Sequence, residues 1–399
     1  MVKSKRSVNS HFAMAVLAIS LFLVYMTANA PTPLYSLWQQ SIHYSATGIS
    51  VIFVVYHLGI VCSLLLMRRV QTARTTMRLL STALITAIIA AVLFASADQF
   101  WQLVTARVLI GLGCGVFISC GISLIVRIGL TQHIINTPLL VTLSCVLGFG
   151  LGPFYAGIIA DIFPTPFRWI FYPLIVALII CFFLLRQLAP SSSITQLTHN
   201  EDEQTKDESP RNYPLFFVAT ALFASPFALA GLFISLGPSM MSESMHTTNH
   251  ALIGFVPLLM FGSGVISQIC LRALSISKQI LIGIIGTFLG GVGVLVAEVH
   301  HWIILMIIAA ILTGIAQSMT QLAGIRLLKE FQPLGSFQRS TSTFFLCGYL
   351  YAAFSIFVMG WVASHMGLQV GSQVFLYLCF MLMAAATGGY LIIHQSKSN

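Results

Sequence analysis

Apolar residues form long runs along the chain, separated by short polar segments. Each run has about twenty residues, which is the length that a helix needs to cross the hydrocarbon core of a bilayer. The runs are too long for barrel strands, and a bilayer accepts only helices or closed barrels. We therefore predict an all-α polytopic membrane protein with twelve transmembrane helices, at residues 12–30, 49–67, 78–96, 101–126, 138–160, 167–188, 213–238, 251–272, 279–298, 302–326, 341–364 and 373–394.

The composition agrees with this pattern, and the positions of the basic residues predict the orientation of the chain in the membrane. The chain has 399 residues, of which 57% are hydrophobic and 7% charged, more apolar surface than a soluble domain of this size can bury. Basic residues fall in every second loop, which places these loops, both termini and the middle loop in the cytoplasm. The net charge of +9 thus follows from topology in a multi-pass cytoplasmic (inner) membrane protein, without a nucleic-acid partner.

Two further features bear on processing and cofactors. A basic start, an apolar core and "ANA" at 28–30 are also typical of a signal peptide, but the length of the apolar run and an internal repeat favour a retained helix. The eight cysteines lie in apolar spans without the spacing of metal ligands, so we expect packing residues and neither a metal site nor a cofactor.

The chain divides into two similar halves. A polar segment predicts a flexible cytoplasmic linker at 189–212 between six-helix bundles at 1–188 and 213–399. The halves share features at an offset of 203–205 positions, including Gly111 with Gly314, and Arg69 with Arg272. Six-helix halves of the same orientation are the arrangement of major facilitator transporters.

Small residues cluster in the fifth predicted span. Glycines let helices approach closely, and a proline removes a backbone hydrogen bond and bends a helix. Tight packing alone and a hinge or seal that controls opening both remain as interpretations. The residues concerned are Gly148, Gly150, Gly152, Pro153 and Gly157.

Three stretches carry a family resemblance over the whole chain. "GFGLGPFYAG" is similar to the fifth-helix antiporter motif of the major facilitator superfamily, and "FRWIFYP" resembles the start of its sixth helix. "ARVLIGLGCG" resembles the fourth-helix motif, through Arg107, Gly111, Gly113 and Gly115. The resemblance implies the fold of two six-helix pseudo-repeats and exchange of drugs or metabolites for protons.

The loop between the second and third helices departs from the family pattern. "CSLLLMRRVQTARTTMR" has Arg68, Arg69 and Arg74 but neither the family's aspartate nor its glycines. A gating role for these arginines and a role in topology alone both stay open.

His57 and Arg107 are the candidates for proton coupling. None of the ten carboxylates lies deep in a predicted span, so we expect no buried acid. His57 lies near the midplane and can change charge near neutral pH; the alternative is a neutral histidine bonded to a neighbouring helix. Arg107 has three interpretations: snorkelling to the outer interface, contact with an anionic substrate, or hydrogen bonds to neutral groups, with Tyr25 or Asn29 as partners. We favour the third.

Other polar residues are candidates for a central cavity. Tyr25 and Asn29 lie one turn apart on a span whose outer end Pro31 and Pro33 should break. Ser225, Gln317 and Gln321 are the candidates in the second half. Such residues also serve to join helices, which is the alternative.

The preferred function is proton-coupled efflux, of the multidrug or metabolite antiporter type, of small amphipathic compounds by alternating access. The alternative is an uptake symporter for a small metabolite, with Arg107 binding an anionic one. A non-transporting receptor is the third hypothesis. We expect no enzyme, because the spans carry no nucleophile–base set. The expected partners are a small-molecule substrate, protons and the bilayer, and the expected state is a monomer.

Overall fold

A computed structural model describes residues 10–67, 73–132, 134, 137–188, 213–331 and 334–398 of the protein. These residues are almost entirely helical, with no strand among them, which confirms the all-α class. Twelve helices within them are long and apolar enough to cross a bilayer, which confirms the predicted number of spans. The predicted linker at 189–212 lies outside the described residues, so the domain boundaries stay a prediction.

The helices of the first half follow the predicted spans, with one short helix added after the first. Their bounds are α1 (Ser10–Asn29), η1 (Thr32–Leu34), α2 (Tyr35–Ile42), α3 (Ala46–Met67), α4 (Ala73–Ala95), α5 (Phe100–Val116), η2 (Phe117–Gly121), α6 (Ile122–Thr131), α7 (Thr137–Ile162) and α8 (Pro166–Leu188).

The second half also begins with a broken first helix and continues with five long ones. Their bounds are α10 (Tyr213–Ile234), α11 (Gly237–Ser239), η3 (Met240–Ser244), α12 (His250–Leu271), α13 (Ile276–His300), α14 (Ile303–Phe331), α15 (Leu334–Met366) and α16 (Leu368–Ser398).

Two of the spans in the first half are interrupted. The helix α1 ends at Asn29, and the chain continues through a 3-10 turn that contains Pro33, which confirms the predicted break. The fourth span changes from α-helix to a π-helical turn at Phe117–Gly121 before it resumes as α6. Such turns occur often at functional sites, and no sequence pattern had indicated this one.

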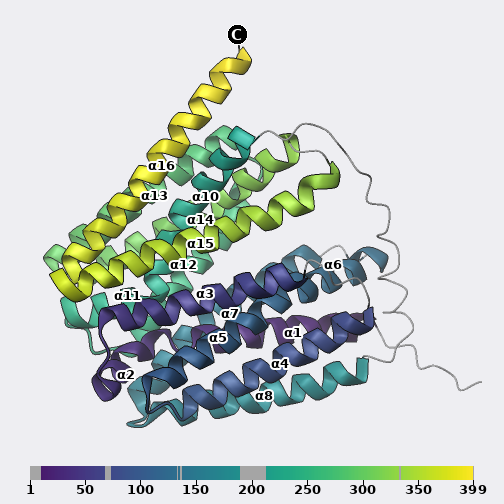
Figure 1. Ribbon diagram of the computed structural model, residues 1–399, viewed down its shortest axis with the longest axis vertical. Helices are drawn as coiled ribbons and strands as arrows, with labels where there is room; N and C mark the ends of the chain where they lie inside the picture. The colour runs from purple at the N-terminus through teal and green to yellow at the C-terminus, as the bar shows by residue number, and fades with distance from the viewer. Residues whose placement is uncertain are drawn as a thin grey trace, which may run out of the picture. The chain divides into compact units, whose positions relative to one another are not determined.

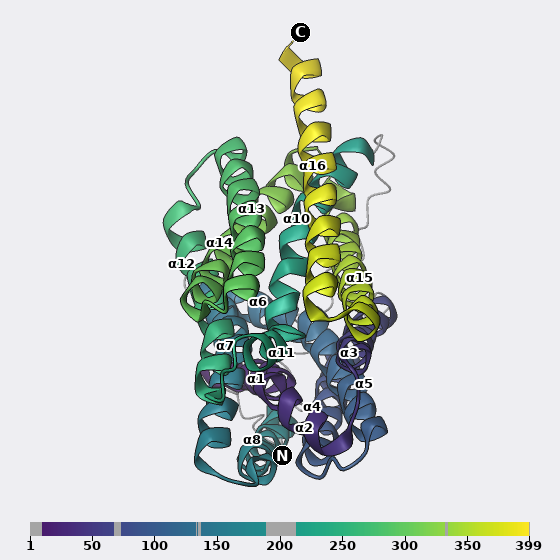
Figure 2. The same ribbon diagram turned by 90° about the vertical axis from the view of Figure 1, so that its left-hand side faces the viewer.

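The helices group into two compact units, each described by itself. Unit 1 comprises the described parts of Met1–Pro31 and Val55–Gln204, and unit 2 those of Thr32–Val54 and Thr205–Asn399. In unit 1, α1 packs on α7 and α8, and α4 packs on α5 and α8 (Figure 1). In unit 2, α14 lies beside α12 and α13, while α10 packs on α14, α15 and α16 (Figure 2).

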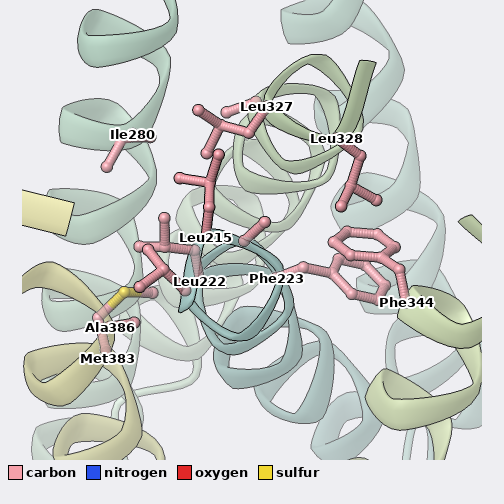
Figure 3. Packing of buried hydrophobic residues seen from close by; sticks show 12 residues of the cluster. Leu215, Leu222, Phe223, Ile280, Leu327, Leu328, Phe344, Met383 and Ala386 are labelled. Atoms are coloured by element: carbon pink, nitrogen blue, oxygen red, sulfur yellow. The ribbon is translucent and has the colours of Figure 1, made fainter. Parts of the chain in front are cut away.

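A buried apolar cluster holds α10 at the centre of unit 2. Phe223 stacks on Phe344 of α15, with ring centroids 4.6 Å apart, while Met383 and Ala386 of α16 lie on the other side of α10 near Leu222 (Figure 3). Leu215, Leu222 and Phe223 recur at helical spacing along α10 and are all buried. The bulky side chains of α10 therefore form the contacts by which α14, α15 and α16 pack around it.

The glycine repeat has the same packing role in both units. A Cβ added to Gly111 of α5 would clash with the carbonyl oxygen of Tyr56 on α3. A Cβ added to Gly314 of α14 would clash with the carbonyl oxygen of Met260 on α12. At both crossings the two helices meet backbone against backbone, which only a residue without a side chain permits. The internal repeat read from glycine spacing is thus a repeat of helix contacts.

Candidate functional site

Arg107 is enclosed within unit 1. Its side chain is only 3% exposed and its Nη1 donates a hydrogen bond of 2.5 Å to the carbonyl oxygen of Ala28. The guanidinium lies 5.5 Å from the ring centroid of Tyr56 and 5.7 Å from that of Phe94. Ring faces attract cations at such distances. The side chain is therefore buried, and these contacts lie on α1, α3 and α4 of unit 1.

The break in α1 provides the acceptor for this arginine. Ala28 lies in the last turn of α1, where carbonyl groups lack the amide four residues later that would bond them inside a helix. The same carbonyls carry the partial negative charge of the helix end, which favours a nearby cation. Because the chain leaves the helix after Asn29, Ala28 can accept from Arg107.

The predicted partners of Arg107 lie on either side of its observed acceptor. The Asn29 amide donates a hydrogen bond of 2.8 Å to the carbonyl oxygen of Tyr25, within its own helix. The ring of Tyr25 packs against Phe149 of α7 at 4.3 Å between centroids. Both residues are buried in unit 1, close in sequence to the carbonyl that holds the arginine.

His57 and Arg107 share one aromatic neighbour. His57 is 5% exposed, and its ring meets the ring of Tyr56 edge-on at 5.1 Å. The Tyr56 ring also lies 5.5 Å from the guanidinium. The contact between Gly111 and the Tyr56 backbone lies one helical turn from Arg107, so close packing of α3 on α5 brings this ring to the arginine. The two coupling candidates thus belong to one buried cluster.

Tyr56 and Phe94 are site residues that sequence reasoning missed. The chain has 29 phenylalanines and 11 tyrosines, so an aromatic residue in a span carries no signal of its own. The sequence places Tyr56 near Arg107 only if one knows where α3 crosses α5. That crossing is defined by Gly111, whose repeat was visible in the sequence.

The glycines of the fifth span contact α1 directly. A Cβ on Gly148 would lie 2.7 Å from the carbonyl oxygen of Phe22, and one on Gly152 would lie 2.5 Å from that of Met26. The contact is therefore made by backbone. Gly150, Pro153 and Gly157 are buried in the same helix, which continues through the proline.

The remaining glycines of the fourth-helix motif face two different helices. A Cβ on Gly113 would approach the Ala83 carbonyl oxygen of α4 at 3.1 Å, whereas one on Gly115 would lie 2.8 Å from the Ile60 carbonyl oxygen of α3. Together with Gly111 they let α3 and α4 pack closely on α5, next to Arg107.

The candidates of unit 2 take part in helix contacts and in a side-chain pair. Ser225 is fully buried and donates a hydrogen bond of 2.7 Å to the Cys379 carbonyl oxygen, which joins α10 to α16. Gln317 donates to Gln321 at 3.0 Å, and both are half-buried on α14. Ala310 stands where Arg107 stands in the repeat and is fully buried, so this charge belongs to unit 1.

Most of the basic loop between the second and third spans lies outside the described residues. Arg68 and Arg69 lie outside the described residues, and so does the side chain of Arg74. Their role in gating stays a prediction.

The expectation of no buried carboxylate is wrong. Glu298 is 4% exposed in unit 2 and hydrogen-bonded to Ser372. The predicted span ended at this residue, but α13 continues to His300, and the beginning of α16 covers the carboxyl group. Glu298 is thus buried because α13 is in contact with α16, a helix distant in sequence. Among the described residues, no cluster of three or more His, Cys, Asp or Glu side chains has the arrangement of a metal site.

Comparison with known proteins identifies the family. The family model of the Major Facilitator Superfamily matches residues 17–334, and the chain belongs to this family. No curated protein matches the chain.

Solved structures of transporters have a similar fold. The chain is similar to a bacterial homolog of the human lysosomal transporter Spinster in an inward-facing and occupied conformation, with 12% identity, a TM-score of 0.68 and coverage of 96% of this chain and 97% of that chain. It is also similar to the nucleoside transporter NupG (11% identity, TM-score 0.72, 96% and 99% coverage) and to a D-xylose-proton symporter (12%, 0.68, 94% and 97%). Identities this low show the fold alone. Family and fold point to a multi-pass membrane transporter, not an enzyme.

Proposed function

We propose that the protein is a proton-coupled exporter of small amphipathic compounds or metabolites that works by alternating access. The observation that carries this proposal is the meeting of three features on one short stretch of α1. Gly148 and Gly152 of α7 contact it by backbone alone, and Ala28 on the same stretch holds Arg107.

This arrangement links helix movement to the buried charge. Helices that meet through glycines have no interlocking side chains, so they can shift along each other at little steric cost. A shift of α1 against α7 moves the Ala28 carbonyl relative to Arg107 and changes the electrostatic surroundings of the nearby Tyr56 and His57. Proton binding near His57 and the opening of the transport path are thereby coupled.

Uptake by symport is the second candidate. Arg107 carries a buried positive charge in unit 1, and a guanidinium binds carboxylate and phosphate groups through paired hydrogen bonds. A symporter for a small anionic metabolite would use this charge for binding.

The proposed location is the cytoplasmic membrane, with both termini in the cytoplasm and the protein acting as a monomer. The distribution of lysine and arginine supports this orientation, because basic loops stay on the cytoplasmic side.

Transport in vesicles with an imposed pH gradient tests the proposal. Inside-out vesicles with an acidic interior should accumulate exported compounds from a panel of amphipathic dyes and metabolites, and an uncoupler should abolish the accumulation.

Cells that lack the protein should become sensitive to the same compounds, and an uncoupler should raise accumulation in cells that have it. Accumulation that ignores the pH gradient would contradict proton coupling, whereas lost nutrient uptake in the deletion strain would favour symport.

Replacing His57 with glutamine tests the proton carrier in unit 1. Glutamine keeps a hydrogen-bonding side chain but cannot bind a proton near neutral pH, so His57→Gln should flatten the pH dependence of transport. His11→Gln is the matched control, because His11 lies at the exposed start of α1. A His57→Gln variant with the wild-type pH profile and rate would exclude His57 as the carrier.

A further inference from the structure

A buried carboxylic side chain lies between α13 and α16 in unit 2. Glu298 is in the last turn of α13, and a hydrogen bond joins its Oε2 to Oγ of Ser372 in α16. Ser372 is fully buried. The second carboxyl oxygen, Oε1, is also buried and has no hydrogen-bond partner among the described residues. An ionised carboxylate in such a place would lose most of its hydration without compensation.

The number of hydrogens available at Ser372 indicates the state of the acid. Its Oγ lies within hydrogen-bonding distance of two oxygens, Oε2 of Glu298 and, at 2.9 Å, the carbonyl oxygen of Gln369. A serine hydroxyl has one hydrogen and can donate only one of these bonds, and an ionised carboxylate donates none. If Glu298 carries a proton, it donates to Ser372, which donates to Gln369. Both bonds then form.

In the part of the chain that the structure describes, the helices that pack most extensively on α13 carry their cations far along the chain from Glu298. The elements packed against α13 are α10, α14 and α16. Helix α10 has no charged residue, and the charges of α14 (Arg326, Lys329, Glu330) and α16 (His394, Lys397) are near the ends of these helices far in sequence from Ile303 and Ser372. On α13 itself, Lys278 is in the first turn.

The titratable groups nearest in sequence are directed elsewhere. His300 and His301 are exposed: His300 stacks on Trp302, and Nδ1 of His301 contacts the carbonyl oxygen of Ser244. His246 packs on the His301 ring at 5.8 Å, in the segment that carries Glu243. The C-terminal end of α13 disfavours a negative charge on Glu298, whereas the first turn of α16 favours one. Because these two effects oppose each other, the hydrogen bonds determine whether Glu298 carries a proton.

Packing alone does not require an acid at this place. At the offset of 203 positions that pairs Gly111 with Gly314, Ala95 of α4 occupies the position of Glu298. The neighbouring Phe94 stacks on Phe171 of α8 with centroids 5.3 Å apart. An aromatic pair thus joins the equivalent helices of unit 1. Glu298 and Ser372 therefore place a polar group where the fold accepts an apolar one.

We propose that Glu298 and Ser372 form a proton-binding site in unit 2, in which the carboxylic acid donates to Ser372 and Ser372 donates to Gln369. The site binds and releases its proton at the end of unit 2 where α13 ends and α16 begins. Its use in coupling rests on the proposed function, but its existence does not.

Infrared difference spectroscopy of the purified protein in lipid nanodiscs tests the site without a substrate. Spectra recorded while the pH is raised should show loss of the carbonyl stretch of a protonated, buried carboxylic acid. Glu298→Gln should remove this band, and Ser372→Ala should shift its frequency because one hydrogen bond is lost. Asp98→Asn and Ser355→Ala are matched controls: Asp98 is exposed, and buried Ser355 bonds only to backbone carbonyls of its own helix.

Thermal unfolding provides a second readout that does not depend on the spectrum. Glutamine can donate to Ser372 as the protonated acid does, so Glu298→Gln should fold and keep its Tm when the pH is raised, while the wild-type Tm falls. An unchanged infrared band in Glu298→Gln would overturn the proposal. Stabilisation by sodium chloride that requires Glu298, without an acid band, would also overturn it in favour of a sodium site. Transport insensitive to the pH gradient, with the band present, would reject the proposed function and leave the site intact.

Discussion

Replacing Arg107 with methionine is expected to abolish transport without unfolding the protein. Methionine has a similar length and no charge, so it removes the desolvation cost of a buried cation, which offsets the loss of the hydrogen bond to Ala28. The Tm should therefore stay near that of the wild type or rise, while the transport rate falls by about 100-fold, equivalent to roughly 2.7 kcal/mol. Initial rates in reconstituted vesicles and the Tm measured in the same detergent check the two parts.

A lysine at position 107 tests whether transport needs only a positive charge there or also the planar guanidinium group. It keeps the positive charge but loses the planar guanidinium that lies near the rings of Tyr56 and Phe94, so Arg107→Lys should lower the rate by about 10-fold. Arg326→Met is the control, because Arg326 also donates to a backbone carbonyl, that of Leu274 at 2.9 Å, but lies near the end of α14. A strongly lowered Tm in Arg107→Met, with the folded fraction transporting normally, would make the arginine structural.

Adding methyl groups to the α7 surface that faces α1 should both destabilise the protein and block transport. In Gly148→Ala and Gly152→Ala the new Cβ atoms would lie 2.7 and 2.5 Å from backbone carbonyl oxygens, which cannot rotate away. Overpacking costs about 1–3 kcal/mol at each position, more than the gain of about 1 kcal/mol from replacing glycine in a helix. The double variant should lower the Tm and reduce transport by about 10-fold or more.

Two other glycines provide the matched controls for this prediction. Gly262 in α12 and Gly388 in α16 have no atom within 4 Å of an added Cβ. Alanine there keeps only the helix-propensity gain, so the Tm should be unchanged or higher and transport normal. If Gly148→Ala and Gly152→Ala behave like these controls, the close contact of α7 with α1 has no part in the transport cycle.

The sequence by itself determined the class, the number of spans and the repeat. Runs of apolar residues must become helices in a bilayer, because no other open structure satisfies the backbone, and this needs no tertiary information. The break after Asn29 followed from the prolines, and the shared role of Gly111 and Gly314 followed from their spacing. Each of these features depends on local chemistry or on a repeated position.

Only the tertiary structure decided which side chains surround the buried charges. Spacing along one helix does not locate its crossing with another, so the acceptor at Ala28 and the ring of Tyr56 were not identified beforehand. The burial of Glu298 is the clearest case. Its position near a helix end indicated exposure, but Ser372, distant in sequence, lies against it when α16 packs on α13. Burial depends on neighbouring helices, and their arrangement is a property of the folded chain.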